Sequence, residues 1–238
     1  KTELTVLGVG AIDQFALNFD VPDEETEEER DDRLYLLDNL PISTQWNYAM
    51  GAKLKKFRDN GFWTFIVSRN MLNNRSYKYA GNDESSEDNL QFNYLSQESE
   101  NKFRAENSIF SKGYTLQYGM NYEFSRYLIE NYDTKFTDQN GLPRDVSSIS
   151  LFNSYGAFVM GSKKYFNDRL IVNLGLRMDG SDFGETAKNP LNQLSPRFST
   201  SYQLKDNLFW NASAGIYYQK PPYTVLGFQN NEGVFENQ

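Results

Sequence analysis

Apolar and polar residues alternate along much of this chain. Residues 168–180, DRLIVNLGLRMDG, place apolar side chains on one parity and mostly polar ones on the other. The apolar set is Leu170, Val172, Leu174, Leu176 and Met178. The opposite set is Arg169, Ile171, Asn173, Gly175, Arg177 and Asp179. This period of two is typical of a β-strand with one apolar and one polar face.

The same pattern predicts nine strands and little helix. The expected strands are residues 3–17, 43–57, 62–79, 90–110, 114–132, 150–165, 169–182, 194–204 and 208–220. Residues 23–38, DEETEEERDDRLYLLD, contain helix-forming residues, but their like charges crowd one another. We therefore expect a mobile, acidic, exposed loop there, with a short helix as the alternative. The fold class that these elements predict is all-β and antiparallel.

Connections between the expected strands alternate between short and long. Short polar turns fall at residues 58–61, 111–113, 167–168 and 205–207. Longer polar stretches cover residues 20–42, 80–90, 133–149, 183–193 and 221–238. An up-and-down barrel of the outer membrane has short turns at one end and long loops at the other, whereas a sandwich has turns of mixed length at both ends. The alternation favours the barrel.

The polar parity also favours a wet interior. Its members include Gln, Asn, Ser, Arg and Lys, for which a dry core offers too few hydrogen-bond partners. Aromatic residues gather beside the short turns, at Phe57, Phe62, Trp63, Phe65, Phe110, Tyr114, Tyr165, Phe166, Phe209 and Trp210. We interpret them as the aromatic girdle of a barrel, with cross-strand pairing at hairpin ends as the alternative.

Composition narrows the function classes. The 238 residues have a net charge of −8, which argues against nucleic acid as a partner. The chain has no Cys and no His, so it lacks thiolate metal ligands, disulfides and the most frequent general base. No run approaches the ~20 apolar residues of a transmembrane helix. Because the sequence begins at Lys1 without a signal-peptide pattern, we expect an internal or processed piece of a longer protein.

Three segments carry a resemblance to a known family. LGLRMDG at 174–180, LSPRFSTSYQL at 194–204 and WNASAGIYYQKPPY at 210–223 resemble the barrel of TonB-dependent outer-membrane receptors, most of all the Bacteroidetes type. The resemblance implies an antiparallel, up-and-down transmembrane β-barrel of 22 strands closed around a plug. Residues 1–238 would then be a partial barrel domain with about nine strands, without the plug and the remaining strands.

The resemblance also implies a function and a location. Such receptors lie in the outer membrane of Gram-negative bacteria and take up scarce nutrients such as iron chelates, vitamins, glycans or peptides. The implied partners are outer-membrane lipid, the plug, the TonB complex, a nutrient ligand and, in some receptors, a surface lipoprotein. The expected protein is not an enzyme. The alternatives are a soluble β-sandwich that binds ligands or acts as an adhesin, and a barrel enzyme with an unusual catalytic group.

Five residues are candidates for substrate contact. Arg177 and Arg197 face inward by parity. Because charge ladders are common inside barrels, we favour a structural network with Asp179 or Glu123; the alternative is contact with the plug or with an anionic substrate. Tyr217, Gln219 and Tyr223 follow the ninth strand, and we expect them at a loop rim, where they suit sugars or peptides.

No catalytic residue, metal site or cofactor is predicted. The acidic runs 23–32 and 82–88 lack the spacing of a calcium loop. The carboxylate pairs Glu98/Glu100 and Asp179/Asp182 have no pocket signal that would favour a glycosidase site.

Overall fold

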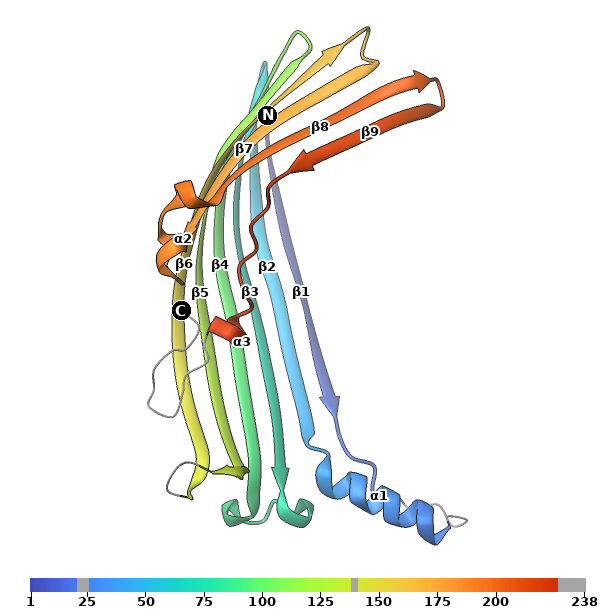
Figure 1. The fold of residues 1–238 in the computed structure, drawn as a ribbon, viewed down its shortest axis with the longest axis vertical. Helices are drawn as coiled ribbons and strands as arrows, with labels where there is room; N and C mark the ends of the chain where they lie inside the picture. Colours follow the sequence, from blue (N-terminus) through green and yellow to red (C-terminus); the bar gives the residue numbers. More distant parts are fainter. Residues whose placement is uncertain (21–25, 138–140, 227–238) are drawn as a thin grey trace.

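The described part of the chain forms one curved antiparallel sheet (Figure 1). The computed structural model describes residues 1–20, 26–137 and 141–226. Nine strands follow one another in sequence order, each paired with the next. They are β1 (Thr2–Phe15), β2 (Ile42–Arg58), β3 (Gly61–Tyr79), β4 (Leu90–Ser111), β5 (Tyr114–Thr137), β6 (Pro143–Tyr165), β7 (Leu170–Ser181), β8 (Leu194–Lys205) and β9 (Leu208–Gly215). The predicted all-β, up-and-down fold class with nine strands is confirmed.

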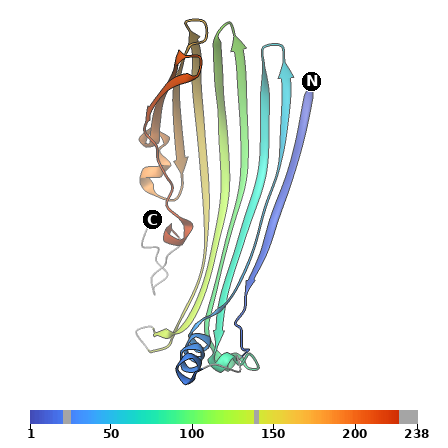
Figure 2. The same cartoon turned by 90° about the vertical axis from the view of Figure 1, so that its right-hand side faces the viewer.

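Short turns and long connections lie at opposite ends of this sheet (Figures 1 and 2). Residues 59–60, 112–113, 166–169 and 206–207 join strands at one end. Gly113 supports its turn with a positive φ of 77°, which costs glycine little. Residues 16–41, 80–89, 138–142 and 182–193 join strands at the other end. The predicted long connection at 133–149 is wrong, because β5 and β6 extend until only residues 138–142 separate them.

The connection from β1 to β2 contains a helix, α1 (Glu27–Asn39). Its N-terminus is a capping box in which Thr26 and Glu29 hydrogen-bond each other's backbone N–H groups. Acidic residues in the first turn also suit the positive end of the helix dipole. The expected loop is therefore wrong and the alternative helix is correct; the helix is exposed on most of its length.

The remaining helical segments are short and sit among the loops. They are η1 (Ala80–Asn82), η2 (Glu87–Asn89), α2 (Glu185–Lys188), η3 (Pro190–Gln193) and α3 (Tyr223–Leu226). No helix in the described residues is both long and apolar enough to cross a membrane.

The two faces of the sheet differ in chemistry. Side chains of one parity, including Glu100 of β4 and both Glu123 and Ser125 of β5, meet residues 216–226, which pass across this side of the sheet (Figure 1). We call this side the inner face. The opposite parity forms the outer face. Large apolar residues on the outer face are exposed along every strand: Leu4, Val6, Met50, Leu54, Phe65, Val67, Phe103, Leu116, Met120, Val159, Leu174, Leu176, Phe198 and Trp210. Exposed apolar surface on this scale indicates a partner that is itself apolar.

The aromatic residues near the short turns divide between the two faces. Trp63, Phe65 and Tyr118 lie on the outer face, and the Trp63 ring contacts both others. Phe57, Phe62 and Phe110 lie on the inner face and contact one another. Only the outer set faces the side that a girdle requires, and the girdle itself stays a prediction. The inner set makes the cross-strand contacts of the alternative.

Candidate functional site on the inner face

The chain leaves the sheet after β9 and crosses the inner face. β9 ends at Gly215, five residues before the predicted end of this strand. Residues 216–226, which we call the crossing segment, then pass in front of the sheet and end in the short helix α3 (Figure 1). Hydrogen bonds join this segment to β4 and β5, which lie several strands away from β9. The segment therefore narrows the space enclosed by the curved sheet.

Tyr223 holds the end of the crossing segment in a small aromatic core. Its ring stacks on Tyr127 of β5 and Phe152 of β6, with centroid distances of 6.1 and 5.8 Å. Tyr223 is 7% exposed and the neighbouring Leu226 is 1% exposed. These residues form the main buried apolar cluster of the described chain, with Ile129 packed against it. Burial of this size stabilises the docked position of the segment.

The Tyr223 hydroxyl lies among polar side chains of β4 and β5. It is 2.7 Å from Ser125 Oγ, 2.9 Å from Glu100 Oε1 and 3.3 Å from Glu123 Oε1. Burial of the phenol, with nearby carboxylates, raises the pKa of Tyr223 above its ordinary value. The hydroxyl is therefore protonated at neutral pH and can donate to a carboxylate.

Two lysines complete this network. Lys220 Nζ donates to Glu123 Oε1 at 2.7 Å and to the Tyr223 hydroxyl at 3.0 Å. Lys102 Nζ lies 2.6 Å from Glu100 and 3.5 Å from Glu123. Both carboxylates are half-buried and each has a cationic partner, which removes most of the cost of placing them away from bulk water. The network thus ties the crossing segment to the wall through both charge and packing.

A polar hollow of about 340 Å³ lies beside the crossing segment on the inner face. Its lining includes Asn121, Arg177, Asp179, Ser195, Arg197 and Gln219. Arg177 donates to Asp179 at 2.6 Å and to Asn121 at 2.9 Å, so its charge is compensated within the wall. The mixture of amides, hydroxyls and both charge signs suits a polar ligand.

Arg197 differs from Arg177 in its contacts. Its guanidinium carbon lies 4.7 Å from the centre of the Tyr217 ring, a cation–π contact. Within the described residues, Arg197 has no carboxylate at ion-pair distance. Arg177, Arg197 and Tyr217 also line a second hollow of about 380 Å³, where Phe158 lies beside them. Arg197 is consequently the cation of this wall that is most available to an anionic group.

The structure brings four of the five predicted site residues together. Arg177, Arg197 and Gln219 line the first hollow, and Tyr217 stacks on Arg197 at the second. Tyr223 is not at a loop rim as expected; it is buried against the wall. Whether any of these residues contacts substrate stays a prediction.

Sequence reasoning missed the roles of Lys102 and Lys220. Lys102 lies on β4, where strand parity could have predicted its inward direction. Lys220 follows the end of β9, where parity has no meaning. Within the described ranges, no group of three or more acidic side chains is arranged to hold a metal ion. The inner face therefore combines polar hollows that suit a polar ligand with a crossing segment that is docked against β4 and β5.

Comparison with known proteins gives one family. A model described as TonB dependent receptor-like, beta-barrel, matches residues 8–237, nearly the whole chain. A search of curated proteins finds no match. The family match does not distinguish the Bacteroidetes type, which stays a prediction.

Proposed function

This chain belongs to the TonB-dependent receptor-like β-barrel family, and we propose that it forms part of the wall of an outer-membrane receptor that takes up a scarce nutrient. The family consists of receptors and transporters of the Gram-negative outer membrane, which supports this role and location. The proposal adds that the inner face contacts the nutrient during uptake and that a plug and the TonB complex control its passage. An iron chelate, a vitamin, a glycan or a peptide are the candidate nutrients.

The observation that carries this proposal is the division of one sheet into two chemically distinct faces. The outer face exposes apolar residues along every strand, whereas the inner face carries charged and amide side chains around hollows. In a barrel the outer face contacts lipid and the inner face contacts water or a plug. The sandwich alternative needs a second sheet against the apolar face, and the described residues form a single sheet.

The inner face supports a polar substrate. Arg197 and Tyr217 together present a charge and a ring, and Gln219 adds an amide at the neighbouring hollow. Rings and amides are the groups that hold sugars and peptides, and the guanidinium suits a carboxylate or phosphate. We infer that Arg197 contacts an anionic group of the nutrient, either in a bound state or while the nutrient passes along the inner face.

Nutrient depletion by living cells tests the function. A strain that lacks the complete gene is compared with the wild type in a medium that contains candidate nutrients at limiting concentration. We expect one nutrient class to stay in the medium of the mutant, and loss of the TonB complex to reproduce the defect. Identical depletion by all three strains would contradict the proposed uptake.

A further inference from the structure

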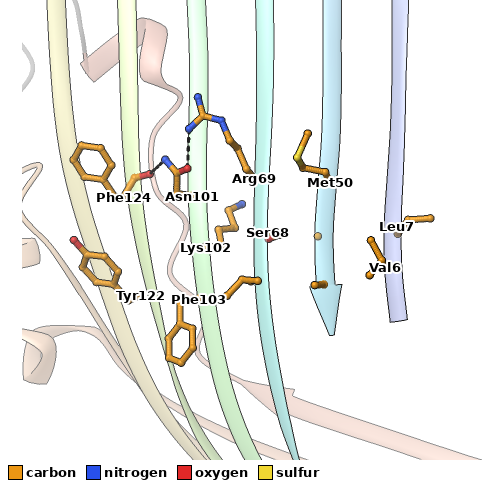
Figure 3. A pocket seen from close by; sticks show the side chains of 13 residues that line it. Val6, Leu7, Met50, Ser68, Arg69, Asn101, Lys102, Phe103, Tyr122 and Phe124 are labelled. Carbon is orange, nitrogen blue, oxygen red and sulfur yellow. Dashed lines mark hydrogen bonds between the residues drawn. The ribbon is translucent and has the colours of Figure 1, made fainter. Parts of the chain in front are cut away.

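A polar cluster around Arg69 lies on the outer face directly beside an apolar hollow (Figure 3). The hollow measures about 570 Å³ and spans β1 to β5. Its apolar lining on the outer face includes Val6, Met50, Val67, Phe103, Tyr122 and Phe124. Most of these side chains are largely exposed, for example Val6 at 72% and Val67 at 53%.

Arg69 is the centre of the polar cluster. Its Nε donates to the Tyr48 hydroxyl at 2.9 Å, and its Nη1 donates to Asn101 Oδ1 at 2.7 Å. Among the described residues, its third nitrogen, Nη2, has only the weak acceptor Met71 Sδ at 4.0 Å. In Figure 3 the guanidinium points away from Phe103 and Tyr122. Two hydrogen bonds therefore fix the orientation of Arg69 and leave one donor group for a ligand.

A second arginine lies near Arg69 on the same face. Arg126 of β5 pairs across the sheet with Ser99, and Ser99 pairs with Met71 of β3. Arg126 is thus two strands from Arg69 and two residues closer to the long-loop end. Its hydrogen bond to Gln97 is long, at 3.4 Å, and no described carboxylate lies at ion-pair distance. Both arginines are partly exposed.

Acidic residues are sparse on the outer face around these arginines, although the whole chain has a net charge of −8. The Asp182 carboxylate lies on the β7 side, where it accepts hydrogen bonds from Asn153 opposite Phe124. β2 and β3 contain neither Asp nor Glu. The acidic residues of β4 have the inward parity of Glu100, and so does Glu123 of β5. The first outward carboxylate of β5 is Glu130, four residues beyond Arg126 and about 14 Å along the strand. The cluster is therefore cationic over β2 to β4, with Asp182 and Glu130 at its margins.

From this geometry we propose that Arg69 and Arg126 bind the phosphate of a membrane lipid whose acyl chain lies in the apolar hollow. The hollow is on the short-turn side of Arg69, within the apolar band, and the arginines are on the long-loop side. A lipid whose headgroup faces the long loops matches both parts, since phosphate meets the cations and hydrocarbon meets Met50, Val67 and Phe103. The inference rests on the proposed position of this sheet in the outer membrane.

The opposite ends of the sheet fix the leaflet. In outer-membrane barrels the long loops face the outside, so the proposed lipid belongs to the outer leaflet. Its chemical class is a phosphorylated lipid with several acyl chains, for which lipid A is a direct probe. A free inorganic anion satisfies only the arginines and leaves the apolar hollow uncovered.

Native mass spectrometry of the complete protein in detergent tests the site. The variants are Arg69→Gln combined with Arg126→Gln, and Lys53→Gln as a control that removes a cation from the inner face of β2. We expect the double variant to bind lipid A about 30-fold more weakly, from the loss of two cations near an anionic headgroup. The control variant should bind as the wild type does, and lipid A without its phosphates should bind the wild type as weakly as the double variant.

Two results would overturn the lipid site. Equal binding of phosphorylated and dephosphorylated lipid A would remove the role of the arginines. If millimolar inorganic phosphate displaced lipid A, the acyl chains would not contribute to binding, and the site would be an anion site only.

Alkaline washing of membranes from cells that produce the complete protein separates failure of the lipid site from failure of the proposed function. If the protein stays in the outer membrane after alkaline washing but shows no lipid preference, only the lipid site is wrong. If it washes off, the membrane position itself is wrong.

Discussion

The docking of the crossing segment depends on the Tyr223 hydroxyl, and Tyr223→Phe tests this dependence. The ring and its stacking on Tyr127 and Phe152 are kept, while the hydrogen bonds to Ser125 and Glu100 are lost. A hydrogen bond to a charged group contributes about 1.5–3 kcal/mol. Removing it should increase the open fraction of the segment by about 10- to 150-fold.

The absence of Cys from the chain makes a thiol reporter specific. Leu226 is 1% exposed in the docked segment, so the Leu226→Cys thiol reacts with a maleimide only when the segment opens. The reporter is placed in the complete protein, in detergent, with and without Tyr223→Phe. We expect labelling to be at least 10-fold faster with Tyr223→Phe, and unchanged with Tyr218→Phe, because Tyr218 is exposed. Equal rates with and without the Tyr223 hydroxyl would refute the reasoning.

Three further predictions concern the wall and the loops. Val67→Arg on the outer face should destabilise the membrane-inserted fold by about 2–4 kcal/mol, measured by urea unfolding in lipid vesicles. Ile66→Arg on the inner face should destabilise it less. The opposite order would contradict the assignment of faces. Gly61→Ala places a Cβ 2.0 Å from the Ser108 carbonyl oxygen and should lower stability by about 1–3 kcal/mol in the same assay, while Gly184→Ala meets nothing within 4 Å and should be neutral. Hydrogen bonds from Thr26 lower the pKa of Glu29 below its ordinary value, so the capping box supports α1 while this carboxyl is ionised. Protection of the amides of residues 30–34 against hydrogen exchange, relative to their intrinsic rates, should therefore fall as the pH falls to 3; unchanged protection would argue against the cap.

Strand parity predicted most of the fold because alternate residues of each strand face opposite sides of the sheet, and the two sides contact different media. β7 is an example, since its predicted range of 169–182 differs from the observed Leu170–Ser181 by one residue at each end. The signal fails where both faces meet water. Residues 133–137 of β5 and 143–149 of β6 extend beyond the apolar band, so these parts of the strands lack alternation and resemble a loop in sequence.

Two local sequence signals predict elements of this fold that hydrophobic alternation does not. Asn140-Gly141 is the typical pair of a tight hairpin, and Gly141 has a positive φ of 78°. Thr26 and Glu29 have the spacing of a capping box, which predicts the start of α1 despite the crowded charges. Both local signals are independent of hydrophobic alternation, so they remain visible in polar segments where alternation is absent.

The candidate site was predictable only where it lies on regular strands. Arg177 and Arg197 follow the parity of β7 and β8, and the structure places both on the inner face. Tyr223 and Lys220 follow the end of β9, and their contacts with β4 and β5 join residues about a hundred positions apart. Such contacts depend on the path of the crossing segment, which no local pattern specifies.

The central claim is that the outer face of this sheet contacts lipid. Nitroxide labels at successive positions 63–68 of β3, introduced one at a time into the complete protein in lipid vesicles, test it directly. Electron paramagnetic resonance compares collisions with oxygen, which dissolves in hydrocarbon, and with a water-soluble nickel chelate. We predict a preference for oxygen at 63, 65 and 67 and none at 64, 66 and 68, because only the odd positions lie on the outer face. A nickel preference at the odd positions, or no alternation, would contradict the account.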